Sequence, residues 1–490
     1  MPTFPPCARR LFFVLSFAAA LSLRTNAATP AASTTPVTPK PLTTEQTRWL
    51  AAANRHEKAG WIYLHIEGEP RARGFQHGYL LAREIAEGLR VTAAQWHHDT
   101  SFDWAWLVDH TKGFINPAVD PEDLAELKGI VEGMRAAGVP TTLDDIIAYN
   151  ASIETTGYWW PEIAKRLDSS ATIVTTPRES CSSFIATGRM TADGGVVLGH
   201  NTMGDYTEAT ANVILDLVPA HGHRILMQTQ AGWIHSGTDF FITGADLVGS
   251  ETTIGDFHGF TEKGIPEFVR MRRATQDAAN LDQWCALMRR GNNGGYANAW
   301  LIGDVNTKEI ARLELGLKFI GFERTKDGYF VSSNVAEDLR ILRLETETHD
   351  LDIRISGVAR RVRWKQLMKE NAGRIDLACA EAMEADCVDL CWNTTDKPNG
   401  RGLNARAEYD PQIGNPFKNP YNPSGTFDAK VVDTTLAKKM SFVARWGSAD
   451  GLAFDADKFL ADHPQFDWMT GVLKSRPSEP WATFTAGENP

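Results

Sequence analysis

The sequence predicts an α+β fold in which antiparallel sheets are covered by helices. Two observations carry this prediction. Apolar residues recur at helical spacing before residue 181, and short strand-like runs separated by turn residues follow it, interrupted by two further helical segments. Helices and strands that are segregated in this way pack as layers around a shared core.

Three helices are expected ahead of the strands. Residues 74–90 carry apolar residues at helical spacing. Asp120 and Pro121 supply an N-cap and a first-turn proline for a second helix, which Gly138 ends. Thr142 begins the third helix.

Two hairpins open the strand-rich part of the chain. Residues 182–188 pair with 196–201, and residues 212–218 pair with 224–230, each pair being joined by a turn. Consecutive hairpins predict antiparallel sheet. Further strands are expected at 240–244, 246–255, 298–304, 310–316 and 329–334, and further helices at 266–273 and from Asn280 onward.

The N-terminus has the layout of a secretory signal peptide. Arg9 and Arg10 precede an apolar run over 11–23, and small residues follow, so cleavage is predicted near Ala27, giving a signal peptide over 1–27. The run would reach about 20 Å as a helix, short of the roughly 30 Å bilayer core, and no later apolar stretch reaches the roughly 18 residues that a membrane-spanning helix needs. We expect an exported protein, periplasmic or secreted, with no transmembrane segment in its mature chain.

Two further segments complete the expected organisation. Residues 28–46 are rich in Thr, Pro and Ala and are interpreted as an extended tether. Residues 47–490 are interpreted as a single domain. The formal net charge of −11 leaves no basic surplus to neutralise a phosphate backbone, so we expect no nucleic-acid partner.

Cysteine usage fits an oxidising compartment. Three cysteines lie close together in the sequence, at Cys379, Cys387 and Cys391, and one disulfide among them is expected. A zinc site there would need a fourth ligand, and none lies nearby. Cys285 falls in a helical stretch and is interpreted as a buried apolar filler.

Common catalytic motifs are mostly missing. The sequence contains no G-x-S-x-G elbow, no H-E-x-x-H motif and no phosphate loop. The pairs His97–His98 and His221–His223 have no carboxylates at a ligand spacing, so they are interpreted as loop or surface histidines. No metal site and no cofactor are expected.

Cys181 is the exception, because it lies between a polar, turn-rich run (169–180) and an apolar strand. If the bond after Ser180 were cut, Cys181 would carry both a thiol and an α-amino group, whose pKa near 7.7 to 8.0 suits a general base. The other interpretation is an inert thiol at a strand end. The position alone leaves both open.

Several motifs resemble the phospholipase B-like family of N-terminal-nucleophile hydrolases. They are GIVEGMRAAGVPTTLDDIIAYNASIETTGYWW (129–160), CSSFIATGRMTADGGVVLGHNTM (181–203), HSGTDFFITGADLVGSETTIG (235–255), GGYANAW (294–300), LNARAEYD (403–410), PSGTFDAKV (423–431) and HPQFDW (463–468). The run GIPEFVRMRR (264–273) is also similar to the related peptidase C45 acyltransferases. The resemblance implies a four-layer α-β-β-α sandwich of antiparallel sheets, and two chains, 28–180 and 181–490.

The resemblance also assigns residues to roles. Cys181 is the matching nucleophile, and His200 and Asn201 belong to a His-Asn-Thr segment that returns beside it, with Asn201 orienting substrate or amine. Asn298 matches an asparagine that helps to form an oxyanion hole. Arg312 and Arg406 are candidates for binding a carboxylate or phosphate of the substrate.

Two departures from the family pattern affect the pocket. Met203 stands where an aromatic residue often follows His-Asn-Thr, and alanines flank Asn298. Pocket shape, and hence substrate, is therefore not fixed by the resemblance.

Three functions follow from these observations. The first is a phospholipase B-like acyl hydrolase acting on a small-molecule or lipid acyl substrate through Cys181. The second is an amidase or acyltransferase of the C45 type, acting on N-acyl amines or peptides. The third is a non-catalytic ligand-binding protein on the same scaffold, which predicts an uncut chain and an unreactive Cys181.

Overall fold

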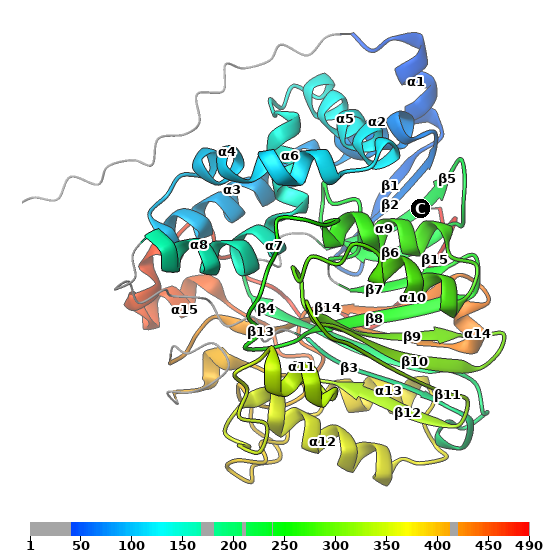
Figure 1. The fold of residues 1–490 in the computed structure, drawn as a ribbon, viewed down its shortest axis with the longest axis vertical. Helices are drawn as coiled ribbons and strands as arrows, with labels where there is room; N and C mark the ends of the chain where they lie inside the picture. Colours follow the sequence, from blue (N-terminus) through cyan, green and yellow to red (C-terminus); the bar gives the residue numbers. More distant parts are fainter. Residues whose placement is uncertain (1–40, 168–180, 208–211, 238, 412–419, 490) are drawn as a thin grey trace, which may run out of the picture. The chain divides into compact units, whose positions relative to one another are not determined.

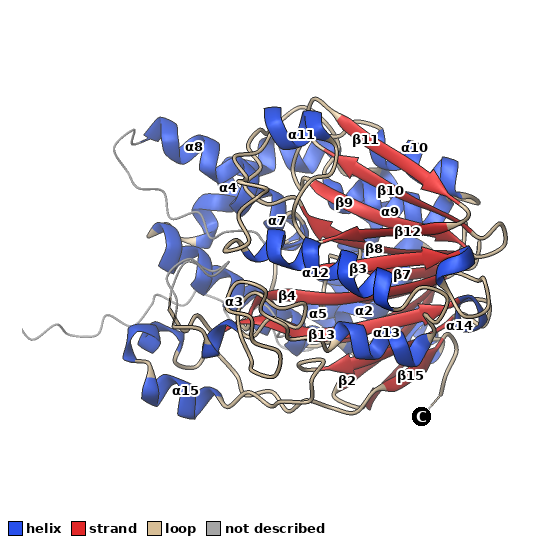
Figure 2. Cartoon of the chain, turned by 90° about the horizontal axis from the view of Figure 1, so that it is seen from below, coloured by secondary structure: helices blue, strands red, loops and turns tan. Residues whose placement is uncertain are grey.

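The strands of the protein form two sheets that lie face to face (Figures 1 and 2). A computed structural model describes residues 41–167, 181–207, 212–237, 239–411 and 420–489, all of which belong to one compact unit. The predicted signal peptide, most of the tether and Ser180 lie outside the described residues. The described part of the tether is not all extended, because a helix begins at Thr44, where Thr43 and Gln46 form a capping box.

The first sheet has the strand order β1-β2-β5-β6-β7-β8-β9-β10-β11 among the described residues. Its neighbouring strands are antiparallel, except that β2 and β5 are parallel. The strands are β1 (Asn54–Lys58), β2 (Trp61–Gly68), β5 (Val213–Pro219), β6 (Ile225–Thr229), β7 (Phe240–Thr243), β8 (Leu247–Thr253), β9 (Asn298–Asp304), β10 (Glu309–Leu315) and β11 (Ile320–Thr325).

The second sheet has the order β12-β3-β4-β13-β14-β15, with antiparallel neighbours throughout. Its strands are β12 (Gly328–Ser332), β3 (Ser182–Thr187), β4 (Val197–Asp205), β13 (Ser424–Asp433), β14 (Ser441–Trp446) and β15 (Ala482–Thr485). Both predicted hairpins are present, as β3–β4 and β5–β6.

Helices cover the outer face of each sheet. Against the first sheet lie α2 (Pro70–Leu80), α5 (Pro121–Ala136), α9 (Glu267–Asp277) and α10 (Leu281–Arg289), and against the second lie α12 (Ser356–Glu370) and α13 (Leu377–Glu384). The remaining helices are α1 (Thr44–Ala51), α3 (Ala82–Thr100), α4 (Trp104–Ile115), α6 (Leu143–Asn150), α7 (Ser152–Glu154), α8 (Trp160–Leu167), α11 (Leu339–Leu344), α14 (Thr434–Ala437) and α15 (Ala456–Asp462).

Three apolar cores separate these four layers. Successive side chains of β3 point to opposite faces of the second sheet and enter different cores. Phe184 packs with Trp364 in the core under α12, whereas Ile185 packs with Leu301 in the core between the sheets. The predicted four-layer α-β-β-α sandwich is therefore confirmed. No helix of the described residues is both long and apolar enough to cross a membrane.

Two local predictions need correction. The helix expected over 74–90 is divided at Leu81, where α2 ends and α3 begins. The disulfide expected among Cys379, Cys387 and Cys391 is not formed, since all three are free thiols in the structure. Cys285 is buried on α10, as expected.

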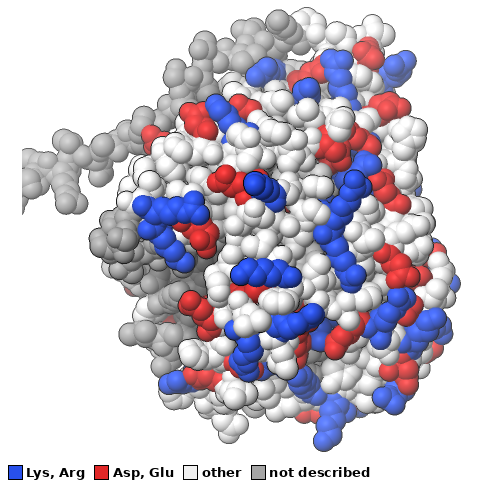
Figure 3. Space-filling model, viewed as in Figure 1, with Lys and Arg blue, Asp and Glu red and all other residues white. Residues whose placement is uncertain are grey.

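Charges are mixed on the surface drawn in Figure 3, where basic and acidic side chains are interspersed. No broad basic patch is visible on that face. This distribution agrees with the acidic composition.

Candidate active site

Cys181 immediately precedes β3 in the second sheet, and its side chain is buried, with a relative exposure of 2%. Its backbone has φ +80°, in the left-handed region that non-glycine residues rarely adopt. Its carbonyl oxygen accepts a hydrogen bond from Nη1 of Arg360 at 2.6 Å. The residue is thus held by a partner on α12 in a strained backbone conformation.

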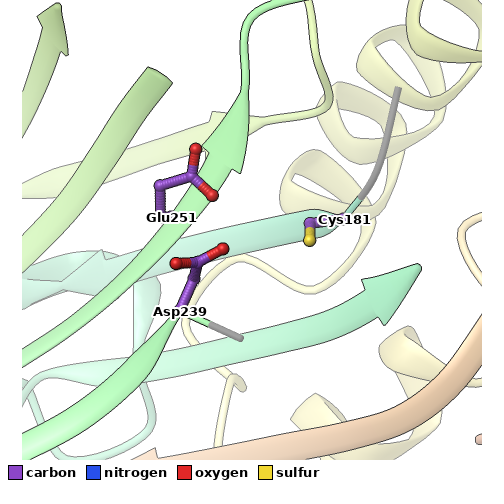
Figure 4. Close-up of side chains that lie close together, drawn as sticks. All are labelled: Cys181, Asp239 and Glu251. Carbon is purple, nitrogen blue, oxygen red and sulfur yellow. The ribbon is translucent and has the colours of Figure 1, made fainter. Parts of the chain in front are cut away.

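Two buried carboxyl groups lie beside the Cys181 thiol (Figure 4). Asp239 immediately precedes β7 and Glu251 lies in β8, and their oxygens and the Cys181 Sγ all lie within 4.8 Å of one another. The Tyr296 hydroxyl lies 2.8 Å from Glu251 Oε2 and 3.1 Å from Asp239 Oδ2. The first sheet therefore brings an acidic pair to the thiol on the second.

Burial controls the protonation of this cluster. Loss of solvation, with the Asp239 charge adding to it, raises the pKa of the Cys181 thiol to about 12, although the Met203 backbone and Lys430 act in the opposite direction. Burial also raises the pKa of Asp239 to about 6 and that of Glu251 well above its usual range. The thiol is therefore protonated near neutral pH, and attack by it requires a proton acceptor.

Arg360 joins the nucleophile's backbone to a second strand end. Besides Cys181, its guanidinium donates to Asn334 Oδ1 at 2.7 Å and to Ser356 Oγ at 3.0 Å. Asn334, which follows β12, donates in turn to the Thr253 carbonyl oxygen at 2.8 Å. On the same helix, Trp364 Nε1 donates to Ser182 Oγ at 2.8 Å. Side chains of α12 therefore make hydrogen bonds to two consecutive residues at the start of β3, Cys181 and Ser182.

A buried ion pair lies in the polar part of the space between the sheets. Lys430 Nζ is 2.5 Å from Asp428 Oδ1, and both side chains are fully buried. Lys430 also contacts Thr202 and Gln228, and Gln228 Nε2 donates to Asp428 Oδ2 at 2.5 Å. Each charged group of the pair therefore has compensating partners in a water-poor region.

The predicted pair His200 and Asn201 does return beside the nucleophile's strand, but the two side chains point in opposite directions. In the β3–β4 register, Ser183 faces His200 and Ser182 faces Asn201. His200 Nε2 lies 2.9 Å from the Glu251 carbonyl oxygen, in the space between the sheets. The Asn201 amide instead donates to the carbonyl oxygens of Glu384 and Leu403, on the side of α13.

Burial holds His200 in its neutral form. Loss of solvation, with the Lys430 charge adding to it, lowers the pKa of His200 well below its ordinary value. Its imidazole is therefore neutral at physiological pH.

The other three predicted site residues lie in different surroundings. Asn298, the first residue of β9, directs its amide to Glu267 Oε1 on α9 at 3.2 Å, on the outer face of the first sheet. Arg312 contacts Glu323 and stacks over Phe330. The roles of Asn298 in the oxyanion hole and of Arg312 in substrate binding stay predictions.

Arg406 is buried and pairs internally with Glu408, its Nε lying 2.6 Å from Glu408 Oε1. The guanidinium is only 1% exposed. Its role in substrate binding likewise stays a prediction.

Sequence reasoning missed Asp239, Glu251, Tyr296, Asn334 and Arg360. Each lies in a segment distant from Cys181, and none belongs to a short catalytic motif. Local signals were nevertheless available: Asp239 and Glu251 lie in the motif 235–255 and Tyr296 in the motif 294–300, and Asn334 ended a predicted strand.

The layered fold places a cysteine at the head of β3 in the second sheet, beside two buried carboxyl groups of the first sheet. A family model described as Phospholipase B matches residues 124–332, which include β3 to β12. The resemblance to the phospholipase B-like family that the sequence motifs predicted is confirmed.

Individual relatives agree with this family. The chain is 27% identical over 293 residues to phospholipase B-like 2 of Mus musculus, covering 52% of this chain and 46% of the relative. It is 22% identical over 322 residues to phospholipase B-like protein C of Dictyostelium discoideum, covering 56% and 54%. The chain thus spans about half the length of these relatives. A solved structure of a mutant conjugated bile acid hydrolase from Clostridium perfringens aligns with a TM-score of 0.31 and 10% identity, covering 54% of this chain and 88% of that one.

Proposed function

We propose that the protein is an acyl hydrolase that cleaves ester bonds of lipid substrates, with Cys181 as an N-terminal nucleophile released by cutting the chain after Ser180. One observation carries this proposal. Cys181 stands at the head of β3 with its thiol beside two carboxyl groups of the opposite sheet and its carbonyl oxygen held by Arg360. An inert strand-end thiol does not need this polar surrounding, which is costly to bury.

The proposed release of the α-amine is supported by the backbone at Cys181. A φ of +80° at a residue with a Cβ stores on the order of 1–3 kcal/mol of strain. Cutting the preceding peptide bond removes that restraint, because an N-terminal residue has no φ. The new α-amine would lie within the same residue as the thiol and serve as its proton acceptor.

The reaction then follows in balanced steps. The Cys181 sulfur bonds to the acyl carbon while the thiol proton passes to the α-amine, giving a tetrahedral oxyanion. The carbon–oxygen bond of the ester breaks, and the α-ammonium donates its proton to the leaving alcohol. Water, deprotonated by the same amine, attacks the thioester, releases the fatty acid and restores the thiol.

Two amides are candidates to stabilise the oxyanion. The family resemblance assigns this role to Asn298. Both amides already donate a hydrogen bond, Asn298 to Glu267 Oε1 and Asn334 to the Thr253 carbonyl oxygen. Asn334 is favoured because Arg360 joins its side chain to the Cys181 carbonyl oxygen. Arg360 is a positioning residue in this scheme, since it contacts the nucleophile's backbone and not the reacting atoms.

The proposal is tested by intact-mass analysis and N-terminal sequencing of the exported protein, followed by assays on a glycerophospholipid and on an N-acyl amine. We expect a chain that begins at Cys181, fatty acid release from the phospholipid, and loss of that release in Cys181→Ala. Turnover of the N-acyl amine alone would favour an amidase. An uncut chain with an unreactive Cys181 would favour a ligand-binding protein. The same sequencing, with an N-terminus near Ala28, tests the inferred signal peptide and export.

A further inference from the structure

We propose that Cys181, Asp239 and Glu251 form a binding site for a thiophilic divalent cation of the Zn²⁺ type, and that the bound ion blocks the nucleophile. Binding of the ion is independent of the proposed function; only the inhibition rests on it. The three residues are the group of His, Cys, Asp and Glu side chains in the described chain whose arrangement could hold a metal.

The geometry of the three ligand atoms suits a small ion. The three ligand atoms lie within 4.8 Å of one another, so an ion placed between them would be within roughly 2.8 Å of each atom. Typical bond lengths are shorter, about 2.3 Å for Zn–S and about 2.0–2.2 Å for Zn–O. Inward movements of less than about 1 Å, within the reach of side-chain rotation, would complete the contacts. Three protein ligands leave one tetrahedral position for water.

The charges around the cluster favour a cation. The carboxyl groups of Asp239, Glu251 and Asp428 act on this region, and the ammonium of Lys430 is the opposing charge. Lys430 is already paired with Asp428 at 2.5 Å, and neither Asp239 nor Glu251 forms an ion pair with a basic side chain of the described residues, although the two carboxyl groups retain one proton between them. The Tyr296 hydroxyl, which faces both, carries no charge to offset them.

A second observation points to a ligand at this position. Glu251 Oε1 is fully buried and accepts no hydrogen bond from a backbone, amide, hydroxyl or basic group in the described part of the chain, although the Glu251 and Asp239 carboxyl groups bond to each other. A buried carboxylate oxygen without such a partner is costly, and a coordinated ion would satisfy it. The sulfur ligand selects the metal, because thiolates prefer Zn²⁺ and its thiophilic relatives over Mg²⁺ and Ca²⁺.

Binding needs no redox partner. A Zn–S bond and two Zn–O bonds form, and the thiol proton, with the proton that the buried carboxyl pair retains, leaves to solvent. The sulfur lone pair that would attack an acyl carbon is then engaged by the metal. The expected result is reversible inhibition and protection of Cys181 from alkylation.

The test uses Co²⁺ as a spectroscopic probe on the full chain in which Cys379, Cys387 and Cys391 are replaced by Ser, since these thiols could bind metal themselves. We expect one Co²⁺ per chain with a thiolate-to-cobalt charge-transfer absorption, displaced by Zn²⁺ and unaffected by Mg²⁺. The absorption should vanish in Cys181→Ser, and the affinity should fall at least 10-fold in Asp239→Asn and in Glu251→Gln. Glu57→Gln, with a side chain 71% exposed, is the control and should bind as the parent does.

The outcomes separate this proposal from the proposed function. Absence of the absorption, or its persistence in Cys181→Ser, overturns the metal site even if the enzyme is active. A Cys181-dependent absorption in a protein that hydrolyses no acyl substrate supports the site and overturns the function. Each variant is compared by circular dichroism, and Asp239→Asn serves where Glu251→Gln does not fold.

Discussion

The Arg360 guanidinium donates from Nη1 to the carbonyl oxygen of Cys181 at 2.6 Å, and from Nη2 to Asn334 Oδ1 at 2.7 Å. One planar side chain on α12 therefore fixes the backbone of the proposed nucleophile and the amide next to it. A lysine cannot reproduce this fork, because it has a single charged nitrogen on a flexible stem.

Arg360→Lys should lower kcat by about 10-fold or more with little change in KM, because about 1.4 kcal/mol of positioning is lost. Steady-state kinetics on the processed protein measure kcat and KM separately. Arg363→Lys, three residues further along α12, is the matched control, since Arg363 pairs with Asp386. If Arg360→Lys lowered only the free energy of unfolding and left kcat intact, the positioning role would be wrong.

The two candidate oxyanion donors make opposite predictions. Asn334→Ala should lower kcat by about 10²–10³, the usual effect of removing one such donor. Asn298→Ala should mainly lower the free energy of unfolding, by about 1–3 kcal/mol, since it leaves the buried Glu267 without its amide partner. Measuring kcat and urea unfolding for both variants decides between them; a loss of kcat confined to Asn298→Ala would restore the assignment made by resemblance.

The sequence predicted the parts of the site that are local along the chain. Cys181 and the pair His200–Asn201 belong to one hairpin, whose turn and alternating strands are visible in the residues. Asp239, Glu251 and Arg360 approach Cys181 only when two sheets and a helix pack together. No short pattern records such distant contacts.

Asn298 shows a second limit of sequence reasoning. Its strand was predicted, but the face on which its side chain lies was not. Along β9, Trp300 and Ile302 face the outer core and Leu301 faces the core between the sheets, so both faces are apolar. A strand buried on both sides lacks the alternation that would distinguish them.

Close packing of α2 against α5 predicts a strong effect of added methyl groups. A Cβ at Gly78 would lie 2.0 Å from the Ile130 carbonyl oxygen, and one at Gly133 would lie 2.3 Å from that of Phe75. Because backbone atoms cannot rotate away, Gly78→Ala should lower the free energy of unfolding by about 3 kcal/mol or more.

The control for this packing is Gly113→Ala on α4, where a Cβ has nothing within 4 Å. Alanine is the better helix former, so this change should raise the free energy of unfolding by about 0.5–1 kcal/mol. Urea unfolding of the two variants measures the contrast. Similar small effects in both would show that the two helices do not approach as closely as described.

Two buried histidines should make the fold sensitive to mild acid. Burial, together with the Arg272 charge, lowers the pKa of His77 to about 4 and that of His235 to about 3. The Gly232 N–H donates to His77 Nε2 at 2.9 Å, which requires that nitrogen to be unprotonated. Both imidazoles therefore stay neutral in the folded protein.

The unfolded chain takes up these protons near pH 6.5, whereas the folded chain does not until the pH falls to about 4 or lower. The contribution of these two imidazoles to the free energy of unfolding should therefore be largest above pH 6.5 and decrease as the pH falls toward 4, by on the order of 3 kcal/mol for each histidine. Urea unfolding at pH 7, 6 and 5 should show a flatter dependence in His77→Gln than in the parent chain. His221→Gln, at an exposed position, should leave the slope unchanged. An unchanged slope in His77→Gln as well would mean that this imidazole is not held neutral by burial.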